Sequence, residues 1–422
     1  MKKDEFIFIV KLAFKNMWHY KRRTIITAAS IAMGLAMFII VDSLLIGAEK
    51  ESENNLRWYE TADIVIMETS YFEERLYKDI NHTITGSAKI VSRLQENGYR
   101  VAPRITFLSE MFFGGVDFDE EGHIATVVTA VKPAPDKEVF KLHSTIVEGR
   151  YIEQNSHEAV IGSFLAEDID AKVGSFITLL FQGKGGFFEL IDLEIVGITD
   201  CPNPNVNRSL LIVDFNTISD YLETDYEAAE IYVSLSSFSN LNREIQKIEK
   251  ILETNNNSLK VVGWEELSKD YLAIAKAKRG GSALILVLVF IIAVVGVSNT
   301  MLMAIYERTK EVAVIRSFGA NDKFIYILFS AESAFVGLLG VLIGLVIAVS
   351  ANLYMVNIGF DFGYMMREID IGYRIQSTMH GSWNFLSMVL SSMFCLFFCG
   401  LFGALFTRRA LKKEISDALR DS

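Results

Sequence analysis

The stretch "FIYILFSAESAFVGLLGVLIGLVIAVSANLYM", residues 324–355, is apolar over more than the roughly 20 residues that a helix needs to cross a bilayer. Three further runs meet the same requirement, at residues 24–47, 281–306 and 384–407. The 422-residue chain is 51% hydrophobic, which agrees with a membrane protein. We therefore predict an α-helical integral membrane protein with four transmembrane helices.

A cleaved signal peptide is the alternative interpretation of residues 24–47, because a basic segment precedes them and small residues follow. The apolar stretch is longer than the roughly 7–15 residues of a signal-peptide core. A transmembrane helix is therefore the favoured interpretation of this run.

Basic residues predict the orientation of the spans, because Lys and Arg near the ends of spans stay on the cytoplasmic side. Residues 1–23 hold seven basic and two acidic side chains, the loop at 307–323 holds four basic side chains, and the tail at 408–422 holds five. The loop at 356–383 has only Arg367 and Arg374. We therefore expect both termini and the 307–323 loop in the cytoplasm, and residues 48–280 and 356–383 on the extracytoplasmic side of the membrane.

The segment 48–280 is expected to form a large α+β extracytoplasmic domain. Its β-rich runs are "ADIVIM", "HEAVIG", "SFITLLF", "FELIDLEIVGI" and "SLLIVDF", each bounded by Gly, Asn, Asp or Pro. The run "SFSNLNREIQKIEKILETN" has apolar residues at helical spacing. Residues 1–23, before the first span, have the pattern of an amphipathic helix at the membrane surface.

Several classes of chemistry are disfavoured by the sequence. The 23 basic and 39 acidic residues of the outer segment disfavour nucleic-acid binding, which needs clustered positive charge. The chain has no GxxxxGK[ST] phosphate-binding loop, so ATP hydrolysis is expected on another subunit. The six histidines lack the i, i+3 or i+4 pairing of helical metal ligands. We predict no catalytic residues, no metal and no cofactor bound by this chain.

The membrane segments contain small and polar residues that predict helix packing. Gly337, Gly340 and Gly344 recur at three and four residues, a spacing that lets helices approach closely. Asn299 in the second span offers an amide for a bond across an interface, and Glu332 is an ionisable group about two turns into the third span. Glu332 is either functional or a structural hydrogen-bonding group, and the sequence leaves both open.

The stretch "YERTKEVAVIRSFGAND", residues 306–322, places a short charged helix between the second and third spans. Val312, Ile315 and Phe318 would lie on one side of this helix, and Gly319 is a natural helix terminator. Asn321 or Asp322 can cap the helix that follows. The apolar side is more than a solvated loop needs, so we predict docking to another protein. The expected polar contacts are Glu307, Arg308, Glu311 and Arg316.

The sequence "NTMLMAIYERTKEVAVIRSFGAN", residues 299–321, followed by "SAESAFVGLLGVLIGLVIA", resembles ABC-transporter permeases of the FtsX/MacB/Lol type, the type VII or mechanotransmission class. Residues 129–181 are similar to the periplasmic domain of the lipoprotein-releasing LolC/LolE group, which is the nearest resemblance within the class. The resemblance implies that the 307–323 loop is a coupling helix that docks on a cytoplasmic ABC ATPase dimer, where ATP and Mg bind.

The resemblance further implies a second homologous permease, forming a homodimer or a heterodimer, in the inner membrane. The expected function is extraction of lipoproteins from the outer leaflet of the inner membrane and their release toward the outer membrane, with a periplasmic chaperone as a further partner. The alternatives are a split MacB-like efflux permease for peptides or amphiphiles, and an FtsX-like regulator of an external hydrolase.

Overall fold

The computed structural model describes residues 3–19, 21–114, 118, 121–235, 240–252, 258–306, 309–361 and 378–411. The chain divides into two compact units, and each is described by itself. Unit 1 comprises Met1–Lys50, Ala275–Asp361 and Met379–Ser422, and unit 2 comprises Glu51–Ile274 and Phe362–Thr378.

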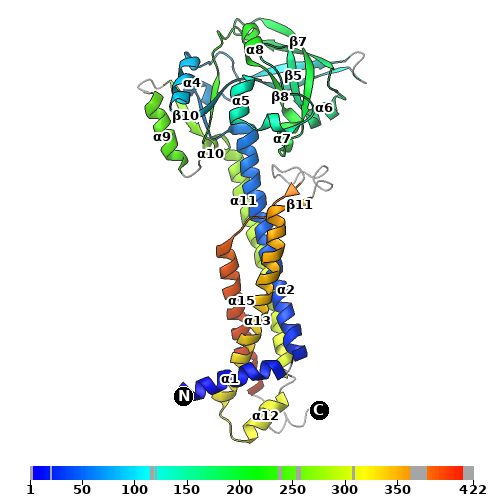
Figure 1. Ribbon diagram of the computed structural model, residues 1–422, viewed down its shortest axis with the longest axis vertical. Helices are drawn as coiled ribbons and strands as arrows, with labels where there is room; N and C mark the ends of the chain where they lie inside the picture. Colours follow the sequence, from blue (N-terminus) through cyan, green and yellow to red (C-terminus); the bar gives the residue numbers. More distant parts are fainter. Residues whose placement is uncertain are drawn as a thin grey trace. The chain divides into compact units, whose positions relative to one another are not determined.

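Long helices dominate unit 1 (Figure 1). The long helices are α1 (Lys3–His19), α2 (Lys21–Leu56), α11 (Lys269–Tyr306), α13 (Asp322–Asn357) and α15 (Phe385–Leu411). The short elements are helix α12 (Thr309–Ser317) and the strands β11 (Phe360–Asp361) and β12 (Thr378–Met379). Within the described residues, three helical segments are long and apolar enough to cross a membrane: Thr24–Thr61, Asp322–Asn357 and Phe385–Arg409. The fourth span, expected at 281–306, falls within α11 and stays a prediction.

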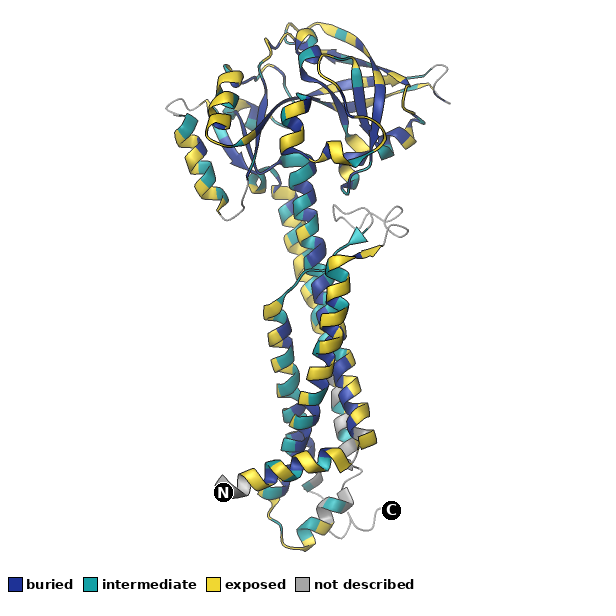
Figure 2. Ribbon diagram, in the orientation of Figure 1, coloured by how far each residue is buried: buried dark blue, intermediate teal, exposed yellow. Residues whose placement is uncertain are grey.

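The core of unit 1 lies between α2, α13 and α15. It includes Ile31, Leu35 and Ile39 from α2, Val336, Val341 and Ala348 from α13, and Met388, Cys399 and Phe406 from α15. The opposite faces of these helices carry exposed apolar side chains such as Leu342, Val346 and Met393 (Figure 2). Exposed apolar faces of this extent are costly in water but match a lipid environment.

Helix α1 packs against the first part of α13. Ile9 and Ala13 are buried in a cluster with Leu328, and the rings of Phe14 and Phe335 meet edge to face at 5.7 Å. The other face of α1 exposes Lys11, Lys15 and the large apolar side chains of Phe8 and Trp18, together with the outer part of Phe14. This distribution is the one that an amphipathic helix at a membrane surface has.

Unit 2 is built on ten described strands. They are β1 (Ile64–Glu68), β2 (Arg100–Phe113), β3 (Gly122–Val131), β4 (Ile146–Gly149), β5 (Glu158–Gly162), β6 (Phe176–Gln182), β7 (Phe188–Thr199), β8 (Leu211–Asp214), β9 (Glu230–Ser234) and β10 (Leu259–Gly263). The five predicted strand runs are confirmed as β1, β5, β6, β7 and β8, and the predicted helix is confirmed as α9 (Leu241–Leu252).

Strand β2 belongs to two parts of the sheet. Its first residues pair with β9 in the sequence β10-β1-β9-β2, and its last residues pair with β6. Because β6 also pairs with β7, the strands β2-β3-β8-β5-β7-β6 close into a six-stranded ring. Closure removes free strand edges and encloses an apolar core. The interior includes Phe107 and Phe181, whose rings meet at 5.0 Å.

Short helices cover the sheet of unit 2. They are η1 (Arg57–Thr61), α3 (Thr69–Glu73), α4 (Ser87–Glu96), α5 (Pro133–Val139), η2 (Leu142–Thr145), α6 (Ser163–Asp168), α7 (Pro204–Ser209), α8 (Phe215–Leu222), α9 and α10 (Trp264–Leu267). Helices α4 and α9 contact each other and pack on β2 and β10 respectively. The α+β class predicted from the sequence is thus confirmed, whereas β2, β3, β4, β9 and β10 were not predicted.

A buried ionic network lies where β2 pairs with β9. Arg104 is paired across the strands with Glu230 and donates from Nε to Asp136 Oδ1 at 2.8 Å. Tyr151 donates to the other oxygen of Asp136 at 2.8 Å. The Arg104 guanidinium also lies 3.4 Å from the centre of the Phe140 ring. Burial of Arg104 and Asp136 is tolerated because each charge has partners on several sides.

Glu230 is also buried and accepts several hydrogen bonds. Thr106 and Tyr232 donate to Oε2 at 2.8 and 3.0 Å, and Lys78 lies 3.5 Å from Oε1. Burial would raise the pKa of Glu230, but the charge of Lys78 and the hydrogen bonds from Thr106 and Tyr232 hold this pKa below its ordinary value. The ionised carboxylate is therefore the stable form in the folded protein.

We predict that Glu230→Gln destabilises the full chain in detergent by about 3 kcal/mol near neutral pH, because it leaves Lys78 and the three hydroxyl donors Tyr71, Thr106 and Tyr232 without their charged acceptor. A lowered pKa stabilises the folded state above the unfolded pKa, and this stability is lost as the pH falls through the folded pKa. The difference between wild type and variant should therefore shrink below about pH 4.5. The measurement is the urea unfolding midpoint as a function of pH.

The matched control is Glu167→Gln, on the exposed surface of α6. This variant should leave the midpoint unchanged at every pH. A Glu230→Gln midpoint equal to that of wild type at pH 7 would contradict the stabilising role of the ionised carboxylate.

Candidate functional site

Helix α12 lies between α11 and α13, and the sequence directly after it sets its geometry. Gly319 has φ +88° and donates from its backbone N–H to the Arg316 carbonyl at 2.9 Å. The next N–H, of Ala320, donates to the Ile315 carbonyl at 3.3 Å. These two bonds form a Schellman motif, in which a left-handed residue, usually glycine, ends the helix. The prediction that Gly319 terminates this helix is confirmed.

The start of α13 is capped by Asn321. Its side-chain oxygen accepts from the Lys323 N–H at 3.1 Å, which satisfies one of the free donors of the first turn. Of the two caps expected from the sequence, Asn321 is the one used. The turn between α12 and α13 is therefore short and fully specified by local hydrogen bonds.

One side of α12 is fastened to the rest of unit 1. Ile315 packs against Ile325 and Phe329 of α13, and Leu411 at the described end of α15 packs against the same two residues. Arg316 reinforces both contacts, with Nε 3.1 Å from Asp322 Oδ1 and a donated hydrogen bond of 3.2 Å to the Leu411 carbonyl. A displacement of α12 would therefore act on α13 and α15 together.

The other side of α12 is open. Phe318 is 87% exposed and Val314 is 43% exposed, while Glu311 is partly exposed. The expected apolar side is thus divided: Ile315 points into its own chain, whereas Phe318 points away from it. Glu307 and Arg308 lie outside the described residues, and the side chain of Val312 is also outside them. Aromatic side chains, phenylalanine included, are enriched at protein interfaces relative to the rest of the surface.

Glycines of α13 allow close packing on two sides of that helix. A Cβ built at Gly337 would lie 2.7 Å from the Cβ of Cys399 on α15. At Gly340 a Cβ would lie 2.7 Å from the Cβ of Ile31 on α2, and at Gly344 it would lie 2.9 Å from the Ala32 carbonyl oxygen. The three predicted glycines therefore join α13 to two different neighbours within the same chain.

A fourth close contact was not predicted from the sequence. A Cβ at Gly403 of α15 would collide with the side chain of Ser333 on α13. Glu332, beside this contact, is only 4% exposed. Asn299, by contrast, lies on the exposed surface of α11. A single glycine such as Gly403 gives no periodic signal, and only the packing of α15 on α13 reveals its function.

Polar contacts tie the helices at the end of the bundle opposite to α12. Asp42 of α2 is buried, and its Oδ2 accepts from Asn384 Nδ2 at 3.0 Å just before α15. The Ser43 hydroxyl donates to the Ser382 carbonyl at 3.0 Å, and the Gly381 N–H donates to the Met355 carbonyl at 3.1 Å. The segment before α15 is thus bonded to both α2 and α13. The Lys50 ammonium also donates to the Ser382 hydroxyl at 2.8 Å, and this set of contacts suits transmission of movement between the helices.

Two family models match the chain. The FtsX-like permease C-terminal model matches residues 283–415, and the MacB-like periplasmic core domain model matches residues 24–251. The first match contains α12, α13 and the close-packing glycines. The second contains α2 and most of the sheet of unit 2.

Similar proteins cover most of the chain at low identity. An uncharacterized ABC transporter permease of Methanocaldococcus jannaschii is 23% identical over 391 residues, which is 89% of this chain and 90% of that protein. The lipoprotein-releasing system transmembrane protein LolC of Neisseria meningitidis is 22% identical, over 77% of this chain and 76% of LolC. The macrolide export ATP-binding/permease protein MacB of a Shewanella species is 23% identical, over 85% of this chain and 55% of MacB.

The close-packing glycines generate a matched pair of variants on α15. Gly403→Ala should destabilise the full chain by about 1–3 kcal/mol, because the added methyl group overpacks the contact with Ser333. A Cβ at Gly400, one turn earlier on α15, would meet no neighbour within 4 Å in the part of the chain that the structure describes, so Gly400→Ala should be neutral or stabilise the helix by up to about 1 kcal/mol. Thermal unfolding in detergent distinguishes the two, and equal midpoints would contradict the packing.

Proposed function

The chain belongs to the ABC-transporter permeases of the FtsX/MacB/Lol type, with an FtsX-like C-terminal region and a MacB-like periplasmic core domain, and from this premise we propose its partners and substrate. It works as a membrane permease subunit with a separate cytoplasmic ATPase dimer and a second homologous permease. Its substrates are lipoproteins, extracted from the outer leaflet of the inner membrane and passed to a periplasmic chaperone.

The observation that carries the proposal is that α12 has two different sides: one is exposed, and the other contacts α13 and α15 of the same chain. Phe318 and Val314 offer apolar surface to a partner, while Ile315 and Arg316 connect the same helix to α13 and α15. A partner that binds the exposed side of α12 and displaces this helix would therefore also displace α13 and α15. ATP and Mg supply the driving reaction on the ATPase, and this chain supplies only the surface that receives the movement.

The movement would pass along the bundle through close helix contacts. Gly337 and Gly403 fix α13 to α15, and Gly340 and Gly344 fix α13 to α2. Interfaces at this spacing do not deform continuously, because closely packed side chains leave little free volume. The helices would therefore shift as a group rather than bend independently.

The orientation follows from charge. The basic residues near α1, α12 and the end of α15 favour a cytoplasmic position for both termini and for α12. Unit 2, whose segment is strongly acidic, is then periplasmic. An acidic domain is repelled by anionic lipid headgroups, which favours solubility beside the membrane.

Two substrate classes are supported by different relatives. Lipoprotein release is supported by the similarity to LolC, which covers about three quarters of both chains. Export of peptides or amphiphilic compounds is the second candidate, because the model that matches unit 2 is MacB-like and MacB is equally similar in sequence. The two classes differ in the molecule that the permease binds, so trapping the bound substrate distinguishes them.

The docking proposal predicts that Phe318→Ala weakens binding of the ATPase by about fivefold or more, since an exposed aromatic anchor contributes over 1 kcal/mol at many interfaces. The same variant should leave the thermal midpoint of the permease unchanged, because Phe318 is 87% exposed. Binding is measured by titration of the ATPase onto the full permease in nanodiscs.

Ser317→Ala, at the neighbouring exposed position, is the control and should bind the ATPase as wild type does. Ile315→Ala should instead lower the thermal midpoint, because Ile315 packs inside the chain. Unchanged ATPase affinity in Phe318→Ala would remove this residue from the docking surface.

Photocrosslinking tests the substrate. A photoreactive amino acid at Leu353, exposed near the outer end of α13, should crosslink to acylated proteins in native membranes in an ATP-dependent manner. The same probe at Tyr326, exposed near the other end of α13, should not. Detection is by mass spectrometry of the crosslinked lipid-modified peptides.

Crosslinks from Leu353 to peptides or amphiphiles without an acyl-modified cysteine would favour the export function. Equal crosslinking of acylated proteins at Leu353 and Tyr326 would contradict extraction from the outer leaflet.

A further inference from the structure

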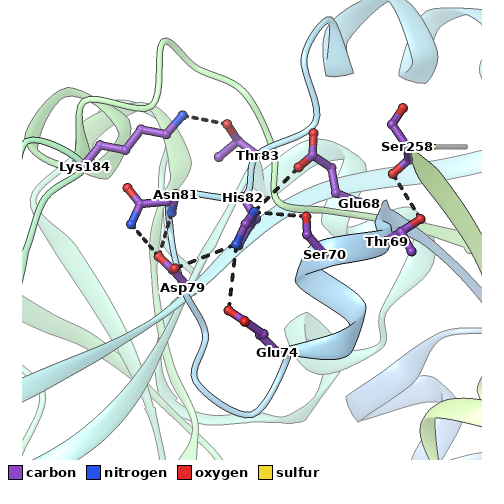
Figure 3. Close-up of polar contacts among 10 residues, drawn as sticks. All are labelled: Glu68, Thr69, Ser70, Glu74, Asp79, Asn81, His82, Thr83, Lys184 and Ser258. Atoms are coloured by element: carbon purple, nitrogen blue, oxygen red, sulfur yellow. Dashed lines mark hydrogen bonds and ion pairs between the residues drawn. The ribbon is translucent and has the colours of Figure 1, made fainter. Parts of the chain in front are cut away.

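A cluster of side chains that can ligate a metal ion lies in unit 2, among residues that the proposed transport mechanism does not use. It is formed by Glu74, Asp79 and His82, in the loop that follows α3 (Figure 3). One ligand atom from each of the three residues lies within 4.8 Å of the others. Glu74 and Asp79 are five residues apart and Asp79 and His82 are three apart, all on a loop. Pairing of histidines at helical spacing therefore gives no sign of this cluster.

The imidazole of His82 lies between the two carboxylates. Its Nε2 is 3.9 Å from Glu74 Oε2 and 3.9 Å from Asp79 Oδ2. Ligand atoms around a tetrahedral zinc ion with bonds of 2.0–2.1 Å are separated by about 3.4 Å. Each His82 contact would have to shorten by about 0.5 Å, and a pair of ligand atoms at the 4.8 Å limit by about 1.4 Å, to reach the first coordination shell of such an ion. Glu74 is exposed and Asp79 and His82 are partly exposed, so side-chain rotation can supply these shifts.

The outer contacts of the cluster hold the ligands in this orientation. The imidazole nitrogen Nδ1 of His82 is hydrogen-bonded to the Ser70 hydroxyl at 3.0 Å (Figure 3). The other ring nitrogen, Nε2, is the one that faces Glu74 and Asp79. Asp79 Oδ1 accepts from the backbone and side-chain nitrogens of Asn81 at 2.9 and 2.8 Å, so Oδ2 is the atom directed at His82. Second-layer hydrogen bonds of this kind fix the tautomer and orientation of metal-binding histidines and carboxylates.

The surroundings of His82 are strongly negative. Glu68 adds a third carboxylate, 3.9 Å from His82 Nδ1. The neighbouring cations are directed elsewhere: Lys78 pairs with Glu230, Arg75 stacks on the Phe72 ring, and Lys184 donates to Thr83. Three carboxylates around one imidazole repel each other, and a divalent cation would relieve this repulsion.

The geometry points to a binding site for a divalent transition-metal cation at Glu74, Asp79 and His82, with Zn²⁺ as the ion that the donor set suits best. One imidazole nitrogen and two carboxylate oxygens are ordinary zinc ligands, and water completes an open site of three protein ligands. Calcium and magnesium prefer oxygen ligands throughout and gain nothing from His82.

A bound metal ion would restrain the loop at residues 74–82 against the end of α3. The same loop carries Lys78, which reaches the buried Glu230 of β9. The ion would therefore rigidify the segment that covers the buried ionic network of unit 2.

Zinc affinity of the full chain in detergent is the direct test, measured by competition with a chromophoric chelator after removal of any histidine tag. Wild type should bind one zinc ion at this site. His82→Gln and Asp79→Asn should each weaken binding by about tenfold or more. X-ray absorption of the zinc-loaded protein should show only nitrogen and oxygen neighbours near 2.0–2.1 Å, with the imidazole signature lost in His82→Gln.

The matched control is Glu73→Gln, which removes an exposed carboxylate directly beside Glu74 and should bind zinc as wild type does. Zinc should also slow tryptic cleavage after Arg75 and Lys78 in wild type and in Glu73→Gln, but not in His82→Gln. Equal zinc affinity in wild type and both ligand variants, or no binding by wild type, would overturn the site. Calcium affinity that depends on Asp79 but not on His82, without zinc binding, would also overturn the assignment.

Discussion

Close packing of α13 against α2 and α15 is the constraint on which unit 1 depends. Lipid tails are as apolar as the helix surfaces, so helices in a bilayer gain little from burying leucine and associate through close van der Waals contact instead. Gly337 and Gly403 allow this approach on the α15 side, and Gly340 and Gly344 allow it on the α2 side. Because the contacts lie on two sides of one helix, α13 is the element to which the others are joined.

The short helix α12 acquires its proposed function from its attachment to this bundle. A free amphipathic helix could bind a partner without moving anything else. Ile315 and Arg316 attach α12 to both α13 and the end of α15, and the Schellman turn at Gly319 keeps the connection to α13 short. Unit 2 is stabilised differently, by a closed ring of strands and by the ionic network of Arg104, Asp136 and Glu230, as expected of a domain that folds in water.

Sequence patterns were reliable where the signal is local. Apolar length identified the three helices whose span the structure supports, and short β-rich runs identified β1, β5, β6, β7 and β8. The missed strand β2 carries Pro103 and several polar residues, a pattern that argues against a central strand. It is nevertheless the strand shared by both parts of the sheet. Its polar side chains, Arg104 and Thr106 among them, are tolerated there because they find partners that only the fold brings near.

The sequence by itself determined the membrane class and the end of α12 at Gly319, and it narrowed the cap of α13 to Asn321 or Asp322, because apolar length and capping depend on neighbours along the chain. Tertiary structure alone decided that Ile315 points inward while Phe318 stays exposed. It also decided which helix each glycine meets, and that His82 lies between Glu74 and Asp79. These facts depend on the distances between atoms of separate helices or of an irregular loop, and periodicity carries no information about them.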